Sequence, residues 1–218
     1  MDKITTAFKE HHSKLFEEHG ATPLGVDWKD ERELLFRYSK MLAVLDKDFL
    51  DGDRVPTLLD VGCGYGGLLT WATEQGIQLD YTGIDIVESM VASGRERHPS
   101  SRFIAGDVLE LDASQRYDFV VCNGTLTQKL AASSIDMEAF ARKLVRRMFD
   151  LANHGIAWNL MSNRVNFTVA NLYYTSPTEW LAWCLGELSP RVRIDHGYSS
   201  LANGRGKYYD YTLYVYKD

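Results

Sequence analysis

The sequence predicts an α/β protein of three layers, in which a mostly parallel sheet of seven strands lies between helices, and three observations support this class. Strand-like apolar blocks alternate along the chain with segments of helical period, the pattern of parallel strands joined by crossover helices. The blocks at 57–61 and 117–122 are apolar through most of their length, as expected for central strands covered on both faces. Only a short glycine-containing stretch, 197–207, separates the last two blocks, so no helical crossover fits there and the last strand should be antiparallel.

The elements are expected in the following order. Residues 1–50 form a helical cap or lid with a break at 20–25, and they belong to the same domain as the core at 51–218. Strands are expected at 57–61, 79–86, 102–105, 117–122, 155–161, 191–196 and 208–216, and helices at 68–75, 87–97, 134–153 and 178–188. The helix at 134–153 is the clearest of these, and Asn153, His154 and Gly155 should mark its end. The last two strands alternate in polarity and suit the edge of the sheet.

Size and charge restrict the class of protein and its partners. With 218 residues, of which 45% are hydrophobic, the chain can bury one sizeable core. The net charge of -6 and the pI of about 5.5 give no general attraction to nucleic acid or anionic lipid, so neither is an expected partner. No stretch resembles a signal peptide or reaches membrane-spanning length, and we therefore expect a soluble, cytoplasmic protein.

The cysteines predict neither a metal site nor a disulfide framework. Cys63, Cys122 and Cys184 are odd in number, far apart in sequence and placed in apolar or glycine-containing settings. We expect reduced, mostly buried thiols and no bound metal.

A glycine turn after the first predicted strand matches two cofactor-binding patterns. Gly62, Gly64 and Gly67 fit the dinucleotide pattern G-x-G-x-x-G, and Asp85 stands 23 positions after Gly62, near the acid that this pattern places on a ribose. The same segment also fits a second pattern, D-x-G-x-G-x-G, through Asp60, Gly62, Gly64 and Gly66. The rest of the chain decides between the two.

Acids stand at the ends of the first three predicted strands. They are Asp60, Asp85 and Asp107, and because parallel strands place their carboxyl ends on one edge of the sheet, all three should line one crevice. Three carboxylates disfavour a pyrophosphate, which is negative, and favour a nucleoside joined to a cationic amino acid.

The chain resembles the class I, Rossmann-like S-adenosylmethionine-dependent methyltransferases of the small-molecule type. The resemblance rests on LDVGCGYG at 59–66, GIDI at 83–86, AGDV at 105–108 and YDFVVCNG at 117–124, in this order and spacing. It covers residues 57–126, and the strand pattern extends it toward the C-terminus. It implies S-adenosylmethionine as cofactor and S-adenosylhomocysteine as product.

The resemblance also implies roles for individual residues. The glycines of the turn would let the backbone approach the methionine part, Asp85 would accept from both ribose hydroxyls, and Asp107 would accept from the adenine amino group. Asn123 would flank the methionine amine or the sulfonium, and Arg37 would hold the methionine carboxylate. The implied cofactor site comprises Arg37, Asp60, Gly62, Cys63, Gly64, Gly66, Asp85, Ile86, Asp107, Val108, Asn123 and Gly124.

The methyl acceptor is less well defined, because an activated sulfonium needs alignment and desolvation more than a general base. The chain lacks the proline box of enzymes that methylate nucleobase amines, the paired glutamates of arginine methyltransferases and a magnesium-binding acid set. We therefore predict transfer to an oxygen or nitrogen of a metabolite or sugar-like acceptor. Trp28 and Tyr174 are the candidates for its binding, and no residue is assigned as catalytic. Histidines of the first 20 residues enter the crevice if that segment closes over it.

Other functions stay open on the sequence alone. Gly62, Gly64 and Gly67 leave a nicotinamide-dependent oxidoreductase as an alternative. The absence of an evident general base leaves a non-catalytic module that binds the cofactor or a partner. The acidity of the chain disfavours RNA as a methyl acceptor, and the arginines of the helix at 134–153 should lie on the face away from the crevice.

Overall fold

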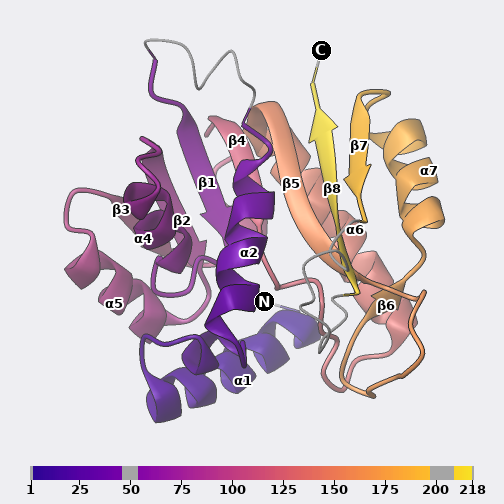
Figure 1. Cartoon of the computed structure of the whole chain (residues 1–218), viewed down its shortest axis with the longest axis horizontal. Coiled ribbons are helices and arrows are strands. Elements are labelled where there is room, and N and C mark those ends of the chain that lie inside the picture. The colour runs from indigo at the N-terminus through magenta and orange to yellow at the C-terminus, as the bar shows by residue number, and fades with distance from the viewer. Residues whose placement is uncertain (1, 46–53, 197–208, 218) are drawn as a thin grey trace.

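The computed structural model describes residues 2–45, 54–196 and 209–217, and Figure 1 shows them as one sheet flanked by helices. The predicted connection at 197–207, the first residue of the strand expected at 208–216 and the end of the cap at 46–50 lie outside the described residues.

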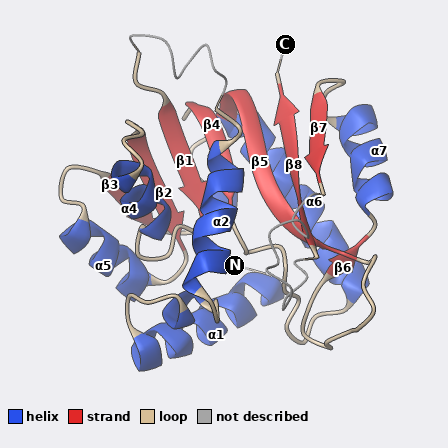
Figure 2. Ribbon diagram, in the orientation of Figure 1, coloured by secondary structure: helices blue, strands red, loops and turns tan. Residues whose placement is uncertain are grey.

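Seven strands form the main path of the sheet (Figure 2). They are β1 (Thr57–Val61), β2 (Asp80–Asp85), β3 (Arg102–Ala105), β4 (Tyr117–Cys122), β5 (Ala152–Ser162), β7 (Val192–Asp195) and β8 (Asp210–Tyr216). Their order is β3-β2-β1-β4-β5-β8-β7, and β8 is antiparallel to both of its neighbours while the first five strands are parallel. The predicted mostly parallel sheet with a reversed last strand is confirmed.

The expectation that both last strands lie toward the edge is wrong for β8. This strand lies between β5 and β7, and every residue in it except Tyr216 is buried. Leu213 and Val215 pack into one core and Tyr214 into the other, so β8 is apolar on both faces. Of the last two strands, only β7 lies at an edge of the sheet, and it is half-buried.

The helix before β5 ends earlier than predicted. α6 (Ser134–Leu151) passes directly into β5, and the backbone N–H of Ala152 still caps the carbonyls of Met148 and Phe149. Asn153, His154 and Gly155 therefore belong to the strand. A short strand that was not predicted, β6 (Tyr174–Thr175), pairs with the end of β5.

Helices cover both faces of the sheet and complete the predicted three layers (Figure 1). α6 and α7 (Pro177–Glu187) pack on one face, where Trp158 of β5 meets Trp180 of α7 with ring centroids 6.0 Å apart. α4 (Gly67–Glu74), α5 (Glu88–Arg97) and α2 (Glu31–Leu42) cover the other face.

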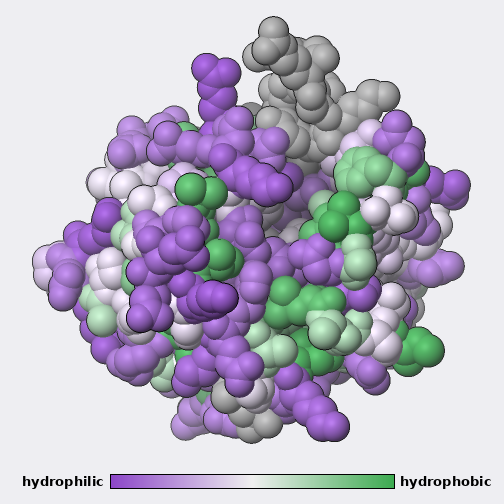
Figure 3. Space-filling view, turned by 90° about the horizontal axis from the view of Figure 1, so that it is seen from below, coloured by the Kyte–Doolittle hydropathy of each residue, from purple (hydrophilic) through white to green (hydrophobic). Residues whose placement is uncertain are grey.

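The N-terminal segment crosses the end of the sheet to which the parallel strands point. It consists of α1 (Lys3–His19), the 3-10 turn η1 (Leu24–Val26) and α2, with the predicted break between the two helices. Figure 1 shows α1 below the tip of β1, and Figure 3 views the molecule from that end, where apolar residues gather near the middle of the face. The segment is thus placed over the carboxyl ends of the strands.

Candidate active site

A cavity of about 220 Å³ lies at the carboxyl ends of the parallel strands, beneath the N-terminal segment. Arg37, Gly66 and Tyr174 are not among the residues that line it. The other predicted site residues do line it: Trp28, Asp60, Gly62, Cys63, Gly64, Asp85, Ile86, Asp107, Val108, Asn123 and Gly124.

Asp85 organises the glycine turn. Its Oδ2 accepts from the backbone N–H of Gly64 at 2.9 Å, and its Oδ1 accepts from that of Val87 at 2.9 Å. Burial raises the pKa of this carboxyl, and the backbone N–H groups oppose the rise. Each carboxylate oxygen offers more than one acceptor position, so Asp85 can support the turn and still accept from a ligand.

Asp60 is almost fully buried at the end of β1, and its Oδ2 accepts from the hydroxyl of Tyr81 at 2.7 Å. Burial raises the pKa of Asp60 to about 7, against the lowering effect of the Tyr81 hydroxyl, and the nearby Asp85 raises it further. At neutral pH this carboxyl is therefore partly protonated.

The glycines of the turn are required by contacts within the chain. Gly62, with φ +73°, leaves room for the hydroxyl of Thr125, which would lie 2.4 Å from an added Cβ. Gly66, with φ +84°, leaves room for the ring of Phe103 and lies outside the cavity lining. Side chains rarely adopt such φ values, so both positions are restricted by backbone conformation as well as by space.

Asp107 follows β3, is half-buried and caps the 3-10 turn η2 (Val108–Glu110) through the backbone N–H of Leu109 at 2.9 Å. Its neighbour Val108 is buried, and Ile86 lines the same part of the cavity from the end of β2. An acceptor oxygen flanked by apolar side chains suits a flat ring that carries an amino group.

Two N-terminal histidines, of the group that the sequence singles out, lie near the cavity. His12 lines it, and burial together with the neighbouring His11 lowers the pKa of His12 to about 4, so that this ring is neutral at pH 7. His11 Nε2 lies 2.8 Å from Asp27 Oδ2, and the same oxygen accepts from Gln128 Nε2 at 2.7 Å. Burial favours a higher pKa for Asp27, but these hydrogen bonds hold it below its usual value.

Arg37, expected to hold a cofactor carboxylate, is buried against Asp210 of β8. Its Nε donates to Asp210 Oδ2 at 2.6 Å, and its guanidinium lies 4.3 Å from the centroid of the Trp28 ring. Asn159 Nδ2 also donates to Asp210 Oδ2, at 3.1 Å, while Asn159 Oδ1 accepts from the backbone N–H of Gly124 at 2.7 Å. A chain of polar contacts thus joins α2, β8, β5 and the turn after β4.

Sequence reasoning missed Asp210 and Asn159. Asp210 lines the cavity. Asn159 does not line it but donates a hydrogen bond to Asp210 from within β5. Both stand in strands whose neighbouring residues are apolar, and a polar residue inside a buried strand was the available signal.

Buried polar atoms without a hydrogen-bond partner concentrate at the cavity. Among the side chains of the described residues there are six such atoms, and two of them are the indole nitrogens of Trp158 and Trp180. The other four all belong to cavity-lining residues, as Thr5 Oγ1, Asn123 Oδ1, Gln128 Oε1 and Asp210 Oδ1. Buried polar groups are nearly always paired, so this arrangement indicates a ligand that supplies hydrogen-bond donors.

Of the two residues predicted to bind the acceptor, Trp28 lines the cavity and Tyr174 does not. Trp28 lines the cavity and packs on Gly124, where an added Cβ would lie 2.8 Å from the indole ring. The hydroxyl of Tyr174 accepts from the backbone N–H of Val169 at 3.0 Å, within the loop after β5. That loop and the end of β5 reach the cavity through Leu172 and Met161.

Comparison with known proteins agrees with this geometry. The model of a methyltransferase domain family matches residues 58–150. A protein of Mycobacterium tuberculosis named as a putative methyltransferase is 25% identical over 163 residues, which are 72% of this chain and 91% of the relative. These matches confirm the predicted enzyme class.

Solved structures confirm the fold. The magnesium protoporphyrin IX methyltransferase of Synechocystis PCC 6803, with bound S-adenosylhomocysteine, has a TM-score of 0.66 at 15% identity over 99% of this chain and all of its own. An amino pentose methyltransferase of Micromonospora echinaspora, with bound S-adenosylmethionine, has a TM-score of 0.57 at 15% identity over 87% of this chain and 98% of its own. No helix among the described residues is both long and apolar enough to cross a membrane.

Proposed function

Because this chain belongs to the class I S-adenosylmethionine-dependent methyltransferases, we propose that it moves the methyl group of S-adenosylmethionine to an oxygen or nitrogen of a small-molecule acceptor. The observation that carries the proposal is the convergence of Asp85, Asp107 and Asn123 on one cavity, from the carboxyl ends of three different strands. This family assignment replaces the oxidoreductase alternative.

The lining residues fit the donor. Asp85 and Asp107 are acceptors, as ribose hydroxyls and an adenine amino group require, and the unpartnered Asn123 Oδ1 suits the methionine ammonium group. S-adenosylmethionine carries a net positive charge, which the acidic lining favours. When bound, it supplies a methyl group on a sulfonium that is already activated for displacement.

The protein's part in the reaction is alignment and exclusion of water. Trp28 and Tyr38 close the cavity from the N-terminal side, and the turn at Gly124 is held by Asn159. Fixed walls of this kind orient the acceptor atom in line with the methyl group and remove competing water. The small-molecule class of acceptor is supported by the size of the cavity and by the similar enzymes, whose named substrates are a porphyrin and an amino pentose.

Calorimetric titration of S-adenosylhomocysteine tests the donor site. We expect saturable binding, and a loss of about 100-fold or more in Asp85→Ala/Asp107→Ala, since two charged hydrogen-bond acceptors disappear. Asp112→Ala is the control, because Asp112 is exposed and lies outside the cavity lining. If the double variant does not fold, Asp107→Ala alone gives the readout. Absence of binding by the unmodified protein would reject the proposal.

The cap is proposed to act as a lid over this site. Thr5, Phe8 and His12 follow one another on a single face of α1 and line the cavity, and Val26 would lie 2.9 Å from a Cβ added at Gly64. Trypsin cleavage within residues 2–40 should therefore slow when S-adenosylhomocysteine is added. Equal cleavage rates with and without it would count against a lid.

A further inference from the structure

Asp210 is a fixed acceptor in the cavity wall, on a strand that β4 and β5 separate from β1 and its glycine turn. The residue is 2% exposed at the start of β8, and its Oδ2 accepts from both Arg37 and Asn159. Its Oδ1 has no hydrogen-bond partner among the described residues. The carboxylate therefore has a set orientation and one oxygen left for a donor from outside the chain.

Gln128 supplies a second acceptor of the same kind. Its Nε2 donates to Asp27 Oδ2, and since an ionised carboxylate only accepts, this contact identifies the nitrogen and the oxygen of the Gln128 amide. Its Oε1 is buried and unpartnered among the described residues. The backbone of Gln128 pairs with Leu172, which holds the residue at the cavity wall.

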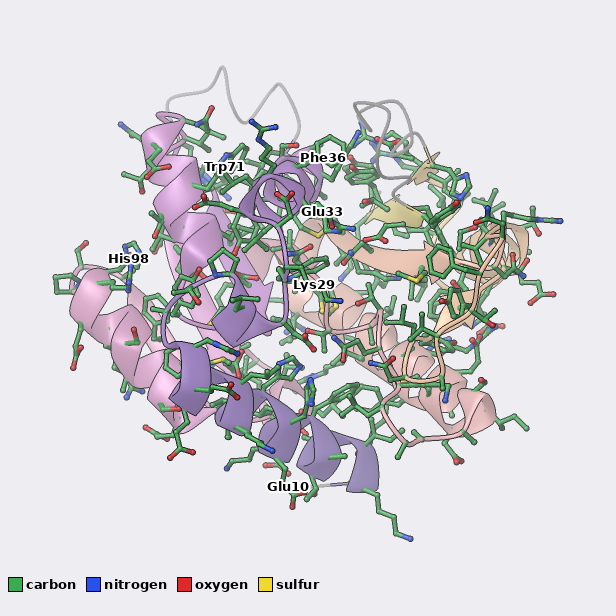
Figure 4. All side chains as sticks on the ribbon, turned by 60° about the horizontal axis from the view of Figure 1, so that its bottom comes forward. Glu10, Lys29, Glu33, Phe36, Trp71 and His98 are labelled. Carbon is green, nitrogen blue, oxygen red and sulfur yellow. The ribbon has the colours of Figure 1, made fainter. Side chains whose placement is uncertain are left out.

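The charged side chains around the cavity also favour a ligand that donates hydrogen bonds. No lysine or arginine is found among the described residues that line it, whereas five aspartates are: Asp27, Asp60, Asp85, Asp107 and Asp210. Arg37, which contacts the lining residues Trp28 and Asp210, is held by Asp210 and Glu33. Figure 4 shows Lys29 on the segment that leads from α1 to α2, where it is exposed and outside the cavity lining.

These features separate the possible acceptors by chemistry. A phosphorylated or carboxylated acceptor would meet acidic side chains and unpaired oxygens without a lining cation to balance it. A group that carries N–H donors would satisfy the unpartnered oxygens and be favoured by the surrounding carboxylates. Asp60, Asp85 and Asp107 belong to β1 and β2 or follow β3, and they suit the donor. This leaves Asp210, Asp27 and Gln128 for the acceptor.

We propose that the methyl acceptor is an amine, whose N–H groups donate to Asp210 Oδ1 and Gln128 Oε1. This inference rests on the proposed function and specifies N-methylation. An amine that arrives as ammonium gives one proton to water; its lone pair then forms the N–CH₃ bond while the C–S bond breaks and leaves its electron pair on sulfur. The products are the methylated ammonium and neutral S-adenosylhomocysteine.

The first test compares matched probes in the presence of saturating S-adenosylhomocysteine. Benzylamine, glucosamine and tyramine are each compared with their N-acetyl forms, and also with benzoate, glucuronate and 4-hydroxyphenylacetate, by ligand-observed NMR titration. We expect the amines to bind about 10- to 100-fold more tightly than their partners, as a charged hydrogen bond allows. Equal affinity, preference for the acids, or no binding of any amine overturns the inference while leaving the donor site intact.

The second test uses variants. Asp210→Asn removes the charge, and Gln128→Met removes the acceptor oxygen without disturbing Arg37, which keeps the test open if Asp210→Asn fails to fold. Each should weaken amine binding about tenfold or more and leave the affinity for S-adenosylhomocysteine unchanged. Asp195→Asn is the control, because Asp195 of β7 pairs with Lys40 of α2 and does not line the cavity. Unchanged amine affinity in both variants overturns the inference, and failure of the unmodified protein to bind S-adenosylhomocysteine overturns the proposed function with it.

Discussion

The buried carboxyl of Asp60 should make the stability of the protein depend on pH, and Asp60→Asn should remove that dependence. Asp60 is 2% exposed, and its pKa of about 7 lies above the unfolded value of 3.8. The folded state therefore binds the proton more strongly than the unfolded state does. The free energy of unfolding falls as the pH rises from the unfolded pKa toward the folded one.

The size of the effect follows from that difference. A rise from 3.8 to about 7 corresponds to roughly 3 pKa units, or about 4 kcal/mol when fully expressed. Between pH 5 and pH 8 the Asp60 contribution should change by about 2–3 kcal/mol, and comparison with the variant separates it from the contributions of other groups. Asn keeps an oxygen that can accept from the Tyr81 hydroxyl and has no proton to lose.

Urea unfolding at pH 5, 6, 7 and 8 measures this difference. The gap between Asp60→Asn and the unmodified protein should widen toward high pH, with the variant gaining stability. Tyr81→Phe is the opposite control, because loss of its hydroxyl removes a contact that lowers the pKa of Asp60. In that variant the pKa of Asp60 should rise, so the loss of stability should occur at higher pH. Parallel curves for Asp60→Asn and the unmodified protein would refute the reasoning.

Three further outcomes are expected. Since the pKa of His12 falls to about 4 on folding, the protein should lose up to about 3 kcal/mol of stability between pH 6.5 and pH 4, and His12→Gln should abolish that loss in acid-induced unfolding. Gly124→Ala should destabilise by about 1–3 kcal/mol in thermal unfolding, because φ is +83° and the new methyl group meets Trp28; Trp28→Ala should recover only the steric part. Arg37→Met should cost about 3–5 kcal/mol in urea unfolding by leaving Asp210 buried without its cation, and a smaller loss than Asp210→Asn would contradict the pairing.

Local patterns were sufficient to predict the part of the cavity lining that lies at the ends of single strands. Asp60, Asp85 and Asp107 each stand at or just after the end of a predicted strand, and the parallel arrangement alone requires those ends to share an edge. The glycine turn was predicted for the same reason. Its residues differ in role, however, because Gly66 makes room for Phe103 and lies outside the cavity lining, a contact that no spacing in the sequence reports.

Residues that depend on long-range pairing could not be predicted. Arg37 was assigned from its place on a helix, but its partner Asp210 is 173 positions away on a strand that was expected near the sheet edge. Insertion of β8 between β5 and β7 brings Asp210 beside Asn159. The predicted boundary between α6 and β5 was wrong for a local reason. The strand begins directly after the helix, without the turn that Gly155 suggested.

The same distinction explains why the donor was easier to identify than the acceptor. The residues proposed for the cofactor come from β1, β2, β3 and β4 or from the turns that follow them, where each residue is adjacent in sequence to the strand that positions it. The residues proposed for the acceptor, Asp27, Gln128 and Asp210, come from the end of the 3-10 turn η1, the segment after β4 and the start of β8, which meet only in the folded chain. A change of acceptor can therefore arise from substitutions in these distant elements while the glycine turn and its acids stay as they are, and variants at Asp210 and Gln128 separate the two halves experimentally.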